Sequence, residues 1–361
     1  MRWQKIEVAS SKSYPICLGA SLEELGQYLE QRVETNAHII VISNPVVSEY
    51  YAEKVMSGLT NFQADQIIVP AGEEEKSLQR LEWITGEALK LGADRKTLVL
   101  ALGGGVIGDL AGFFASIFMR GIRLIQIPTT LLAQVDSSIG GKVAVNHPGG
   151  KNLIGAFYPP LAVWTDFSTL QTLPWKEVLD GLAETIKHAL IADRELFEFI
   201  QSHQKQIIER DTATFKEMTS RSLMVKVRIV SEDEKEEGKR MLLNFGHSFG
   251  HALETELAYR GITHGQGVSI GMVAAANLAK ARGIISSAEV DKLINLLESF
   301  GLPTSIDKDK DHQKLVTNMQ ADKKNRGGQK ILILPKGLGQ AVICKDCSDE
   351  EIVEAWMAIT K

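Results

Sequence analysis

The sequence predicts an α/β N-terminal domain with a largely parallel sheet, residues 1–173, followed by an all-α C-terminal domain, residues 174–361. In the first half, short runs of β-branched and apolar residues alternate with amphipathic stretches. After Leu173-Pro174 the strand signal largely ends, and long segments with an apolar period of 3.6 residues take over. At 361 residues the chain also exceeds the size that one hydrophobic core usually organises, which favours two domains.

The elements of the first half follow from its periodicity. Runs with the composition of buried strands are residues 38–43, 66–69, 97–102, 123–127 and 162–166. Helical patterns at 46–58, 77–91 and 106–119 separate them. Strands that are apolar on both faces and separated by helices are typical of a parallel sheet covered on both sides. In the second half, two short strand-like runs at 330–335 and 340–344 precede a closing helix from Asp349.

Composition and charge exclude several classes of function. A formal charge of -5 does not provide the basic face that nucleic acid binding needs. The sequence has neither the apolar run of a signal peptide nor an uninterrupted membrane segment. Cys17, Cys344 and Cys347 form a sparse, odd set that suits the cytoplasm. Cys344 and Cys347 could form half of a zinc site or a redox pair, but without a second pair ordinary thiols are favoured.

A glycine-rich turn follows the predicted strand at 97–102. Gly103, Gly105 and Gly108 fit the pattern G-x-G-x-x-G and open a predicted helix. Glycines there let the backbone approach a pyrophosphate, whose charge the helix N-terminus stabilises. Glycines also occur wherever a strand meets a helix closely. Because the turn follows a later strand than in the standard dinucleotide fold, we expect a Rossmann-like variant.

The segment from Pro128 to Asn152 is expected to be a long functional loop without regular structure. It concentrates polar and charged residues beside glycines, namely Thr129, Thr130, Asp136, Lys142, Lys151 and Asn152. Lysines and amides beside flexible backbone suit a phosphate group, which accepts hydrogen bonds and attracts cations. The alternative is a solvated surface loop.

Three of the eight histidines, His247, His251 and His264, fall within eighteen residues. His247 and His251 are four residues apart and are expected on one face of a helix. Glu184 lies upstream on another predicted helix, with Lys187 one turn later. Two or three imidazoles with a carboxylate are a plausible site for zinc or a similar divalent metal.

Several cations lie in helical or apolar surroundings, and each alone is most simply a surface residue: Lys187, Lys226, Arg240 and Lys323. Arg240 and Asn244 are expected on the same helix face as His247 and His251, at one-turn spacings. This places a guanidinium near the expected metal, and arginine is suited to bidentate binding of a carboxylate.

Together these motifs resemble the 3-dehydroquinate synthase family. The matching stretches are GGGVIGDLAGFFAS, MRGIRLIQIPTTLLAQVDSSIGGKVAVN, GGKNLIGAFYPP, GLAETIKHALIAD, MLLNFGHSFGHALE, THGQGVSIGM and ADKKN, which spread from about Pro70 to Pro335. The resemblance implies an N-terminal NAD-binding domain, a helical C-terminal domain with one divalent metal, and a cytoplasmic homodimer. The implied metal is zinc, with cobalt as the second candidate.

The resemblance also implies roles for individual residues. Glu184, His247 and His264 would be the metal ligands, and His251 would lie near the substrate instead. Residues implied around the substrate phosphate are Arg120, Lys142, Asn152 and His251. Those implied near its carboxylate and hydroxyls are Lys226, Arg240, Asn244 and Lys323, and Asp136, Lys187 and Glu236 match other active-site positions. NAD contacts would come from Glu73, Lys76, Gly105, Val106, Ile107, Gly108, Asp109, Thr129, Thr130, Lys142, Lys151 and Thr172.

The implied activity is that of a carbon–oxygen lyase of the shikimate pathway, in aromatic amino acid biosynthesis. It converts a phosphorylated sugar acid, 3-deoxy-D-arabino-heptulosonate 7-phosphate, into 3-dehydroquinate and phosphate. The resemblance implies transient oxidation of the C5 alcohol by NAD, elimination of phosphate, reduction of C5 again, and ring closure by an internal aldol step. NAD is regenerated in each turnover, so the pocket must retain NADH and the reactive intermediate.

Three alternatives remain. Another sugar-phosphate cyclase, such as 2-deoxy-scyllo-inosose synthase, would act on glucose 6-phosphate, which has no carboxylate for Arg240 and Lys226 to bind. A metal-dependent alcohol or glycerol dehydrogenase would release NADH, and its pattern lacks the lysine-bearing loop. A binding protein without catalysis is disfavoured by the intact Glu184, His247, His264, Lys151 and Arg240.

Overall fold

The computed structural model describes residues 3–258, 261–324 and 331–361, and the side chains of residues 320–324 lie outside this description. The chain forms two compact units, which divide after Pro174. The first unit is α/β and the second is helical, as the sequence predicts. In the described parts of the chain, no helix has the length and hydropathy needed to cross a membrane.

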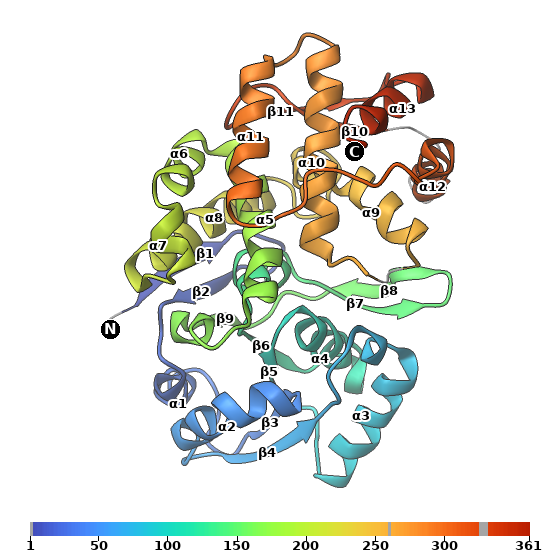
Figure 1. Cartoon of the computed structure of the whole chain (residues 1–361). Helices are drawn as coiled ribbons and strands as arrows, with labels where there is room; N and C mark the ends of the chain where they lie inside the picture. The colour runs from blue at the N-terminus through green and yellow to red at the C-terminus, as the bar shows by residue number, and fades with distance from the viewer. Residues whose placement is uncertain (1–2, 259–260, 325–330) are drawn as a thin grey trace. The chain divides into compact units, whose positions relative to one another are not determined.

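The first unit is built on a seven-stranded sheet (Figure 1). Its strands, in spatial order, are β1 (Gln4–Val8), β2 (Tyr14–Leu18), β9 (Ala162–Thr165), β6 (Arg123–Pro128), β5 (Leu98–Gly103), β3 (His38–Ser43) and β4 (Gln63–Ile68). The β1–β2 pair is antiparallel and every other neighbouring pair is parallel. The strands at 38–43, 97–102, 123–127 and 162–166 are found within about one residue of their predicted limits. The β1–β2 hairpin is not among the predicted strands.

Helices cover both faces of this sheet (Figure 1). They are α1 (Leu25–Glu30), α2 (Pro45–Gly58), α3 (Leu78–Lys90) and α4 (Gly105–Ile117), with short helical turns at η1 (Leu22–Glu24), η2 (Glu73–Glu75), η3 (Phe118–Arg120) and η5 (Phe167–Leu170). Side chains alternate along β3, where Ile39 and Val41 face the core under α1 and α2. Ile40 and Ile42 face the core under α3 and α4. This two-sided burial explains the uninterrupted apolar run of the strand.

The prediction of a long loop without regular structure from Pro128 to Asn152 is wrong in part. It contains the π-helical turn η4 (Ala133–Ser137) and the strand β7 (Lys142–His147), which pairs antiparallel with β8 (Gly150–Phe157). Val143 and Val145 are buried against α4, whereas Lys142 is exposed. The alternation in KVAVN is therefore that of a half-buried strand, a pattern that the abundance of polar and glycine residues obscured.

The second unit consists of helices with one short ribbon (Figure 1). Its elements are α5 (Trp175–Ala192), α6 (Arg194–Ser202), α7 (Gln204–Ile208), α8 (Thr212–Glu232), η6 (Lys239–Asn244), α9 (His247–Glu256), α10 (His264–Ala281), α11 (Ser287–Ser299), α12 (His312–Lys324), β10 (Leu332–Pro335), β11 (Ala341–Cys344) and α13 (Asp349–Met357). The strands β10 and β11 pair antiparallel, so the unit is not purely α-helical. They coincide with the two strand-like runs that the sequence predicts, and α13 begins at the predicted Asp349.

Candidate active site

Three helices of the second unit approach one another closely because glycines lie between them. A Cβ on Gly265 of α10 would overlap the Asp180 Cα of α5. A Cβ on Gly271 of α10 would overlap the Gly246 carbonyl oxygen. A Cβ on Gly250 of α9 would lie 2.8 Å from the Gly267 carbonyl carbon. No side chain fits in these spaces, so α5, α9 and α10 form a tight framework.

We expect Gly271→Ala to destabilise this framework. The new methyl group would collide with backbone rather than with a movable side chain, so the free energy of unfolding should fall by about 3 kcal/mol or more. Urea unfolding measures the change. At Gly86 of α3, no atom lies within 4 Å of the place that a Cβ would occupy, and Gly86→Ala is the control, expected to stabilise by about 0.5–1 kcal/mol. An unchanged midpoint for Gly271→Ala would contradict the close approach.

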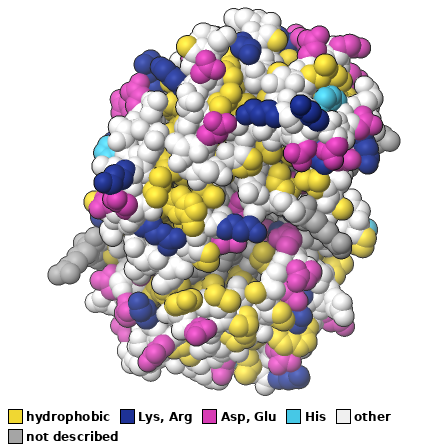
Figure 2. All heavy atoms as spheres, viewed as in Figure 1, with side chains coloured by type: hydrophobic (Ala, Val, Ile, Leu, Met, Phe, Trp, Pro, Cys, Tyr) yellow, Lys and Arg dark blue, Asp and Glu magenta, His cyan; other side chains and the backbone are white. Residues whose placement is uncertain are grey.

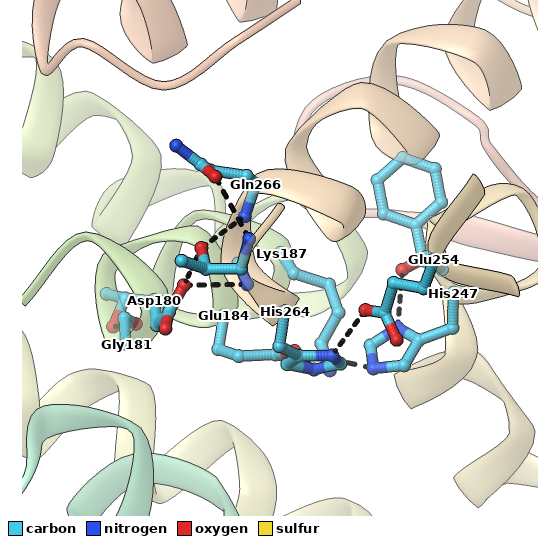
Figure 3. A network of polar contacts seen from close by, with 12 residues as sticks. Asp180, Gly181, Glu184, Lys187, His247, Glu254, His264 and Gln266 are labelled. Atoms are coloured by element: carbon cyan, nitrogen blue, oxygen red, sulfur yellow. Dashed lines mark hydrogen bonds and ion pairs between the residues drawn. The ribbon is translucent and has the colours of Figure 1, made fainter. Parts of the chain in front are cut away.

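Two of the three histidines begin helices. His264 is the first residue of α10, whose N-terminus is capped by Thr263 and Gln266. Asp180 Oδ1 accepts hydrogen bonds from Thr263 Oγ1 at 2.5 Å and from the Gly265 backbone N–H at 2.8 Å, which ties this end of α10 to α5 (Figure 3). His247 is the first residue of α9.

The prediction that residues 240, 244, 247 and 251 share one face of a continuous helix is wrong. Arg240 and Asn244 belong to the 3-10 helix η6, and α9 starts only at His247. Gly246 between them has a φ of 78°, in the left-handed region, and its close contact with α10 leaves no room for a side chain. His247 and His251 do share a face of α9, with ring centroids 5.4 Å apart.

The three helices bring Glu184, His247 and His264 together. Glu184 Oε1 lies 3.4 Å from His247 Nε2 and 3.2 Å from His264 Nε2, and one ligand atom from each residue falls within 4.8 Å of the others. Glu184 is fully buried and comes from the middle of α5. A carboxylate and two imidazoles converging in this way make a candidate site for a divalent metal.

A second group of possible ligands overlaps the first. His251, Glu254 and His264 also have ligand atoms within 4.8 Å of one another. Glu254 Oε1 lies 3.1 Å from His264 Nδ1, so His264 faces a different carboxylate with each ring nitrogen (Figure 3). Glu254 is not among the predicted site residues. Its place on α9, one turn after His251, is the sequence signal that could have indicated it.

Electrostatics couple these groups strongly. Burial opposes the charged form of Glu184, but the ion pair with the buried Lys187 and the nearby His247 outweigh it and hold the pKa of this carboxyl well below its usual range. Burial also opposes protonation of His264, yet the carboxylates of Glu184 and Glu254 outweigh it and raise the pKa of His264 to about 10. The two carboxylates therefore favour positive charge at His264, as they would favour a bound cation.

The other predicted residues of the second unit are placed as follows. Lys226 is buried on α8, and Arg240 is buried with its Nη1 donating to the Glu234 carbonyl oxygen. Asn244 Nδ2 donates to Glu236 Oε1 at 2.5 Å, so these two residues are neighbours. The side chain of Lys323 lies outside the described part of the structure.

In the first unit, the glycine-rich turn lies at the carboxyl end of β5. From β3 the chain continues to β4 on one side of the sheet, whereas from β5 it continues to β6 on the other side. The strand order therefore reverses between β3 and β5. Open parallel sheets bind ligands at such a point, at the carboxyl ends of the strands. Gly105 begins α4, with Gly104 as its N-cap residue. The turn thus presents free backbone N–H groups of a helix N-terminus.

The glycines of this turn also allow the strand and the helix to pack closely, which is the alternative explanation of the motif. A Cβ on Gly103 would lie 2.7 Å from Ile107 Cβ, and one on Gly108 would lie 2.9 Å from Gln126 Oε1 of β6. The contact at Gly103 needs a small residue whether or not a nucleotide is bound, whereas the Gln126 side chain could move to relieve the contact at Gly108. Gly105 has more space, with the Ser137 Oγ at 3.2 Å.

Lys76 is the centre of a polar cluster beside this turn. Its Nζ lies 2.7 Å from Asp109 Oδ2 and also donates to Asn152 Oδ1, and Glu73 Oε1 is 3.9 Å away. Burial raises the pKa of Asp109, although Lys76 works against this. Asn146, absent from the predicted set, accepts from the Asn152 backbone N–H at 2.9 Å and donates to Glu73 Oε1 at 2.8 Å. It connects the β7–β8 hairpin to η2.

The remaining predicted residues of the first unit are spread over several elements. The Thr129 backbone N–H donates to the Gly103 carbonyl at 3.0 Å, and Thr130 Oγ1 accepts from the Ala133 N–H at 3.1 Å. Thr172 Oγ1 is hydrogen-bonded to Tyr51. Val106 and Ile107 lie in the first turn of α4, Asp136 in η4, Lys142 and Lys151 on β7 and β8, and Arg120 in η3.

The cysteines are free thiols. Cys344 ends β11 and Cys347 precedes α13. Burial raises the pKa of Cys347 to about 11 and also raises that of Cys344. Neither residue belongs to a group of possible metal ligands among the described residues. Thiols that stay protonated near neutral pH are poor nucleophiles, which supports their reading as ordinary thiols.

Surface charge agrees with the composition. On the face that Figure 2 shows, Lys and Arg side chains are interspersed with Asp and Glu.

Comparisons with known structures support the fold. A 2-epi-5-epi-valiolone synthase from Streptomyces hygroscopicus, solved with NAD+ and Zn2+ bound, matches with a TM-score of 0.89 at 26% identity, over 99% of both chains. A 2-deoxy-scyllo-inosose synthase with carbaglucose-6-phosphate, NAD+ and Co2+ matches with a TM-score of 0.83 at 27% identity, over 98% of this chain and 99% of that one. An iron containing alcohol dehydrogenase, 17% identical over 99% of this chain and 98% of that one with a TM-score of 0.68, shares the fold.

Sequence comparisons are more specific. The family model for the 3-dehydroquinate synthase N-terminal region matches residues 66–180, and that for the C-terminal region matches residues 181–325. A 3-dehydroquinate synthase from Pseudoalteromonas atlantica is 43% identical over 338 residues, which cover 94% of this chain and 95% of that protein. These matches place both the glycine-rich turn and the Glu184–His247–His264 cluster inside family-defining regions, and the chain belongs to the 3-dehydroquinate synthase family.

Proposed function

We propose that this protein is a 3-dehydroquinate synthase, which converts 3-deoxy-D-arabino-heptulosonate 7-phosphate into 3-dehydroquinate and phosphate. The observation that carries this proposal is the convergence of Glu184, His247 and His264 on helices of a chain that belongs to this family. We assign NAD binding to residues 1–173, and metal and substrate binding to residues 174–361. We further propose that the enzyme acts in the cytoplasm as a homodimer.

The donor set fits a divalent metal. One carboxylate and two imidazoles suit zinc or cobalt, and three protein ligands leave a position for the substrate. The burial of Glu184 supports this fit, because a buried carboxylate needs cations close by, and Lys187 is one of them. We propose Glu184, His247 and His264 as the ligands. When bound, the metal polarises a substrate hydroxyl as a Lewis acid and so favours loss of its proton.

The turn after β5 fits NAD. Gly103 to Gly105 lie at the reversal point of the sheet, and α4 points its N-terminus at this edge. We propose that Gly105, Val106, Ile107, Gly108 and Asp109 contact the cofactor through this turn. When bound, NAD accepts a hydride from the substrate alcohol and returns it later in the same turnover. The other cofactor contacts we propose are Glu73, Lys76, Thr129, Thr130, Lys142, Lys151 and Thr172.

The second unit holds the groups we propose for the sugar acid. Arg240 is buried, and its Nη1 donates to a backbone carbonyl oxygen; we propose that its planar guanidinium binds the substrate carboxylate. We propose that Lys187, which forms an ion pair with Glu184, holds or moves a proton near the reacting alcohol. The further substrate residues we propose are Lys226, Asn244, His251, Glu236 and Lys323, with Arg120, Asp136, Lys142 and Asn152 from the first unit.

The other sugar-phosphate cyclases are the second candidates, since two of them share the fold. A glucose phosphate has no carboxylate that the guanidinium of Arg240 could bind in a bidentate way. The buried Arg240 therefore favours the heptulosonate substrate. A dehydrogenase activity has less support. The alcohol dehydrogenase is only 17% identical to this chain, whereas the matching family models are those of 3-dehydroquinate synthase.

The test is a single assay. The metal-loaded protein is incubated with NAD and 3-deoxy-D-arabino-heptulosonate 7-phosphate while free phosphate and the absorbance of NADH are followed. Many equivalents of phosphate per enzyme without accumulation of NADH are expected. Glucose 6-phosphate as the sole productive substrate would favour an inosose synthase, and NADH from a simple polyol without phosphate release would favour a dehydrogenase.

A further inference from the structure

Glu254 is a buried carboxylate with no role in the proposed chemistry. It lies on α9, and only 3% of its surface is exposed. Its Oε1 is 3.1 Å from Nδ1 of His264, the first residue of α10 (Figure 3). A carboxylate is rarely buried unless it has a defined partner. The contact with a proposed metal ligand suggests what that partner is for.

The two ring nitrogens of His264 face two different carboxylates. Nε2 lies 3.2 Å from Glu184 Oε1, and Nδ1 lies 3.1 Å from Glu254 Oε1. In the metal-bound state His264 must be a neutral imidazole, which has one N–H and one lone pair and supplies the lone pair to the metal. If Nδ1–H donates to Glu254, the lone pair is on Nε2, on the side of Glu184. The contact therefore selects the tautomer in which His264 and Glu184 can share a metal.

His247 shows the same arrangement with a different acceptor. Its Nδ1 lies 3.2 Å from the Phe245 carbonyl oxygen, and its Nε2 lies 3.4 Å from Glu184 Oε1. A carbonyl oxygen can only accept a hydrogen bond, so Nδ1 carries the proton and Nε2 the lone pair. Both histidines thus present Nε2 to the same carboxylate oxygen, each directed by a hydrogen bond on its far side.

Packing holds Glu254 in this position. A Cβ on Gly267 of α10 would lie 3.2 Å from Glu254 Oε1 and 3.4 Å from its Cγ. Gly267 therefore makes room for the carboxylate between α9 and α10. The same two helices are in close contact at Gly246 and Gly271. Because the backbone is fixed on both sides, Glu254 has little freedom to turn away from the imidazole.

We propose that Glu254 is a positioning residue that orients His264 and fixes its tautomer, and so raises the affinity of the metal site without being a ligand. This inference rests on the proposed metal site at Glu184, His247 and His264. It differs from the other possible arrangement, in which His251, Glu254 and His264 hold the metal and Glu254 is itself a ligand.

The experiment compares metal binding by the full-length wild type with Glu254→Ala, Glu254→Gln and Glu184→Ala. Zinc affinity is measured by competition with a chelator, and the ligand field is read from the visible absorption of the Co2+ form. Loss of such a supporting hydrogen bond typically weakens binding 10–100-fold, and we expect this of Glu254→Ala, with the Co2+ bands near their wild-type positions. Glu254→Gln keeps an acceptor oxygen, so it should recover most of the affinity and also serves if the alanine variant folds poorly.

The matched control is Glu256→Gln. Glu256 is on the same helix, two residues after Glu254 and therefore on a different face, and it pairs with Lys314 at 3.0 Å. We expect it to bind zinc as the wild type does. Wild-type affinity in Glu254→Ala would overturn the positioning role. Co2+ bands that shift in Glu254→Ala as they do in Glu184→Ala would overturn it in favour of a ligand. If Glu184→Ala alone keeps full affinity, the proposed metal site fails instead, which is a separable result.

Discussion

Replacing Glu184 with alanine is expected to remove the metal and nearly all activity. A metal acting as a Lewis acid contributes several kcal/mol, and each 1.4 kcal/mol is a factor of ten, so kcat/KM should fall by at least about 10³-fold. The change also leaves the buried Lys187 without its carboxylate, which should lower the free energy of unfolding by about 3–5 kcal/mol. Metal analysis after dialysis, phosphate release and urea unfolding measure the three effects.

The control for this prediction lies on the same helix. Glu177 of α5 is exposed, and Glu177→Ala should keep its metal and its activity. Glu184→Gln keeps the volume of the side chain but removes its charge, and it separates the loss of packing from the loss of the ligand. Full metal content in Glu184→Ala would remove Glu184 from the ligand set and, with it, the observation on which the proposed function depends.

Arg240→Ala is expected to lose activity while keeping its metal. Hydrogen bonds to charged groups contribute about 1.5–3 kcal/mol each, so loss of a bidentate contact to the substrate carboxylate should lower kcat/KM by roughly 10²–10⁴-fold. The backbone around Arg240 should remain in place, because Asp233 Oδ2 accepts from the Arg240 backbone N–H at 2.9 Å, independently of the side chain. Steady-state kinetics with the heptulosonate phosphate and metal analysis check this.

Two further variants sharpen this result. Arg240→Lys keeps the charge but loses the planar fork, so its activity should be intermediate. Arg228 is exposed on α8, and Arg228→Ala should behave as the wild type. Turnover of Arg240→Ala close to that of the wild type would show that this arginine does not bind the carboxylate, and would remove the argument against a glucose phosphate as substrate.

The sheet of the first unit could be predicted because its signal is local. The run at residues 38–43 is apolar on both faces, and β3 is buried at each of its six positions. The glycine-rich turn likewise follows its strand directly and opens α4, as expected. The β7–β8 hairpin was not predicted, because its strand pattern lies among glycines and polar residues. Its burial depends on α4, which is distant in the sequence.

Residue spacing alone predicts which types of residue form the candidate metal site, but not which histidines meet at Glu184. Spacing along one helix favours His247 and His251, and their rings are indeed neighbours. The partner of His247 across Glu184 is nevertheless His264, which begins another helix. Residue spacing cannot show this, because the distance between α9 and α10 is determined by glycine contacts between the helices. The family resemblance indicated His264, and the geometry supports it.

The sequence by itself determined the α/β unit followed by a helical one, the position of the glycine-rich turn, and the residue types at the proposed metal site. These features depend on periodicity and on chemistry that each residue carries wherever it lies. The tertiary structure decided which nitrogen of each histidine faces Glu184, that Glu254 contacts His264, and that Gly246 separates Arg240 from α9. Such features depend on how closely segments that are far apart in the chain pack together, because small differences in the distance between them determine which groups are in contact.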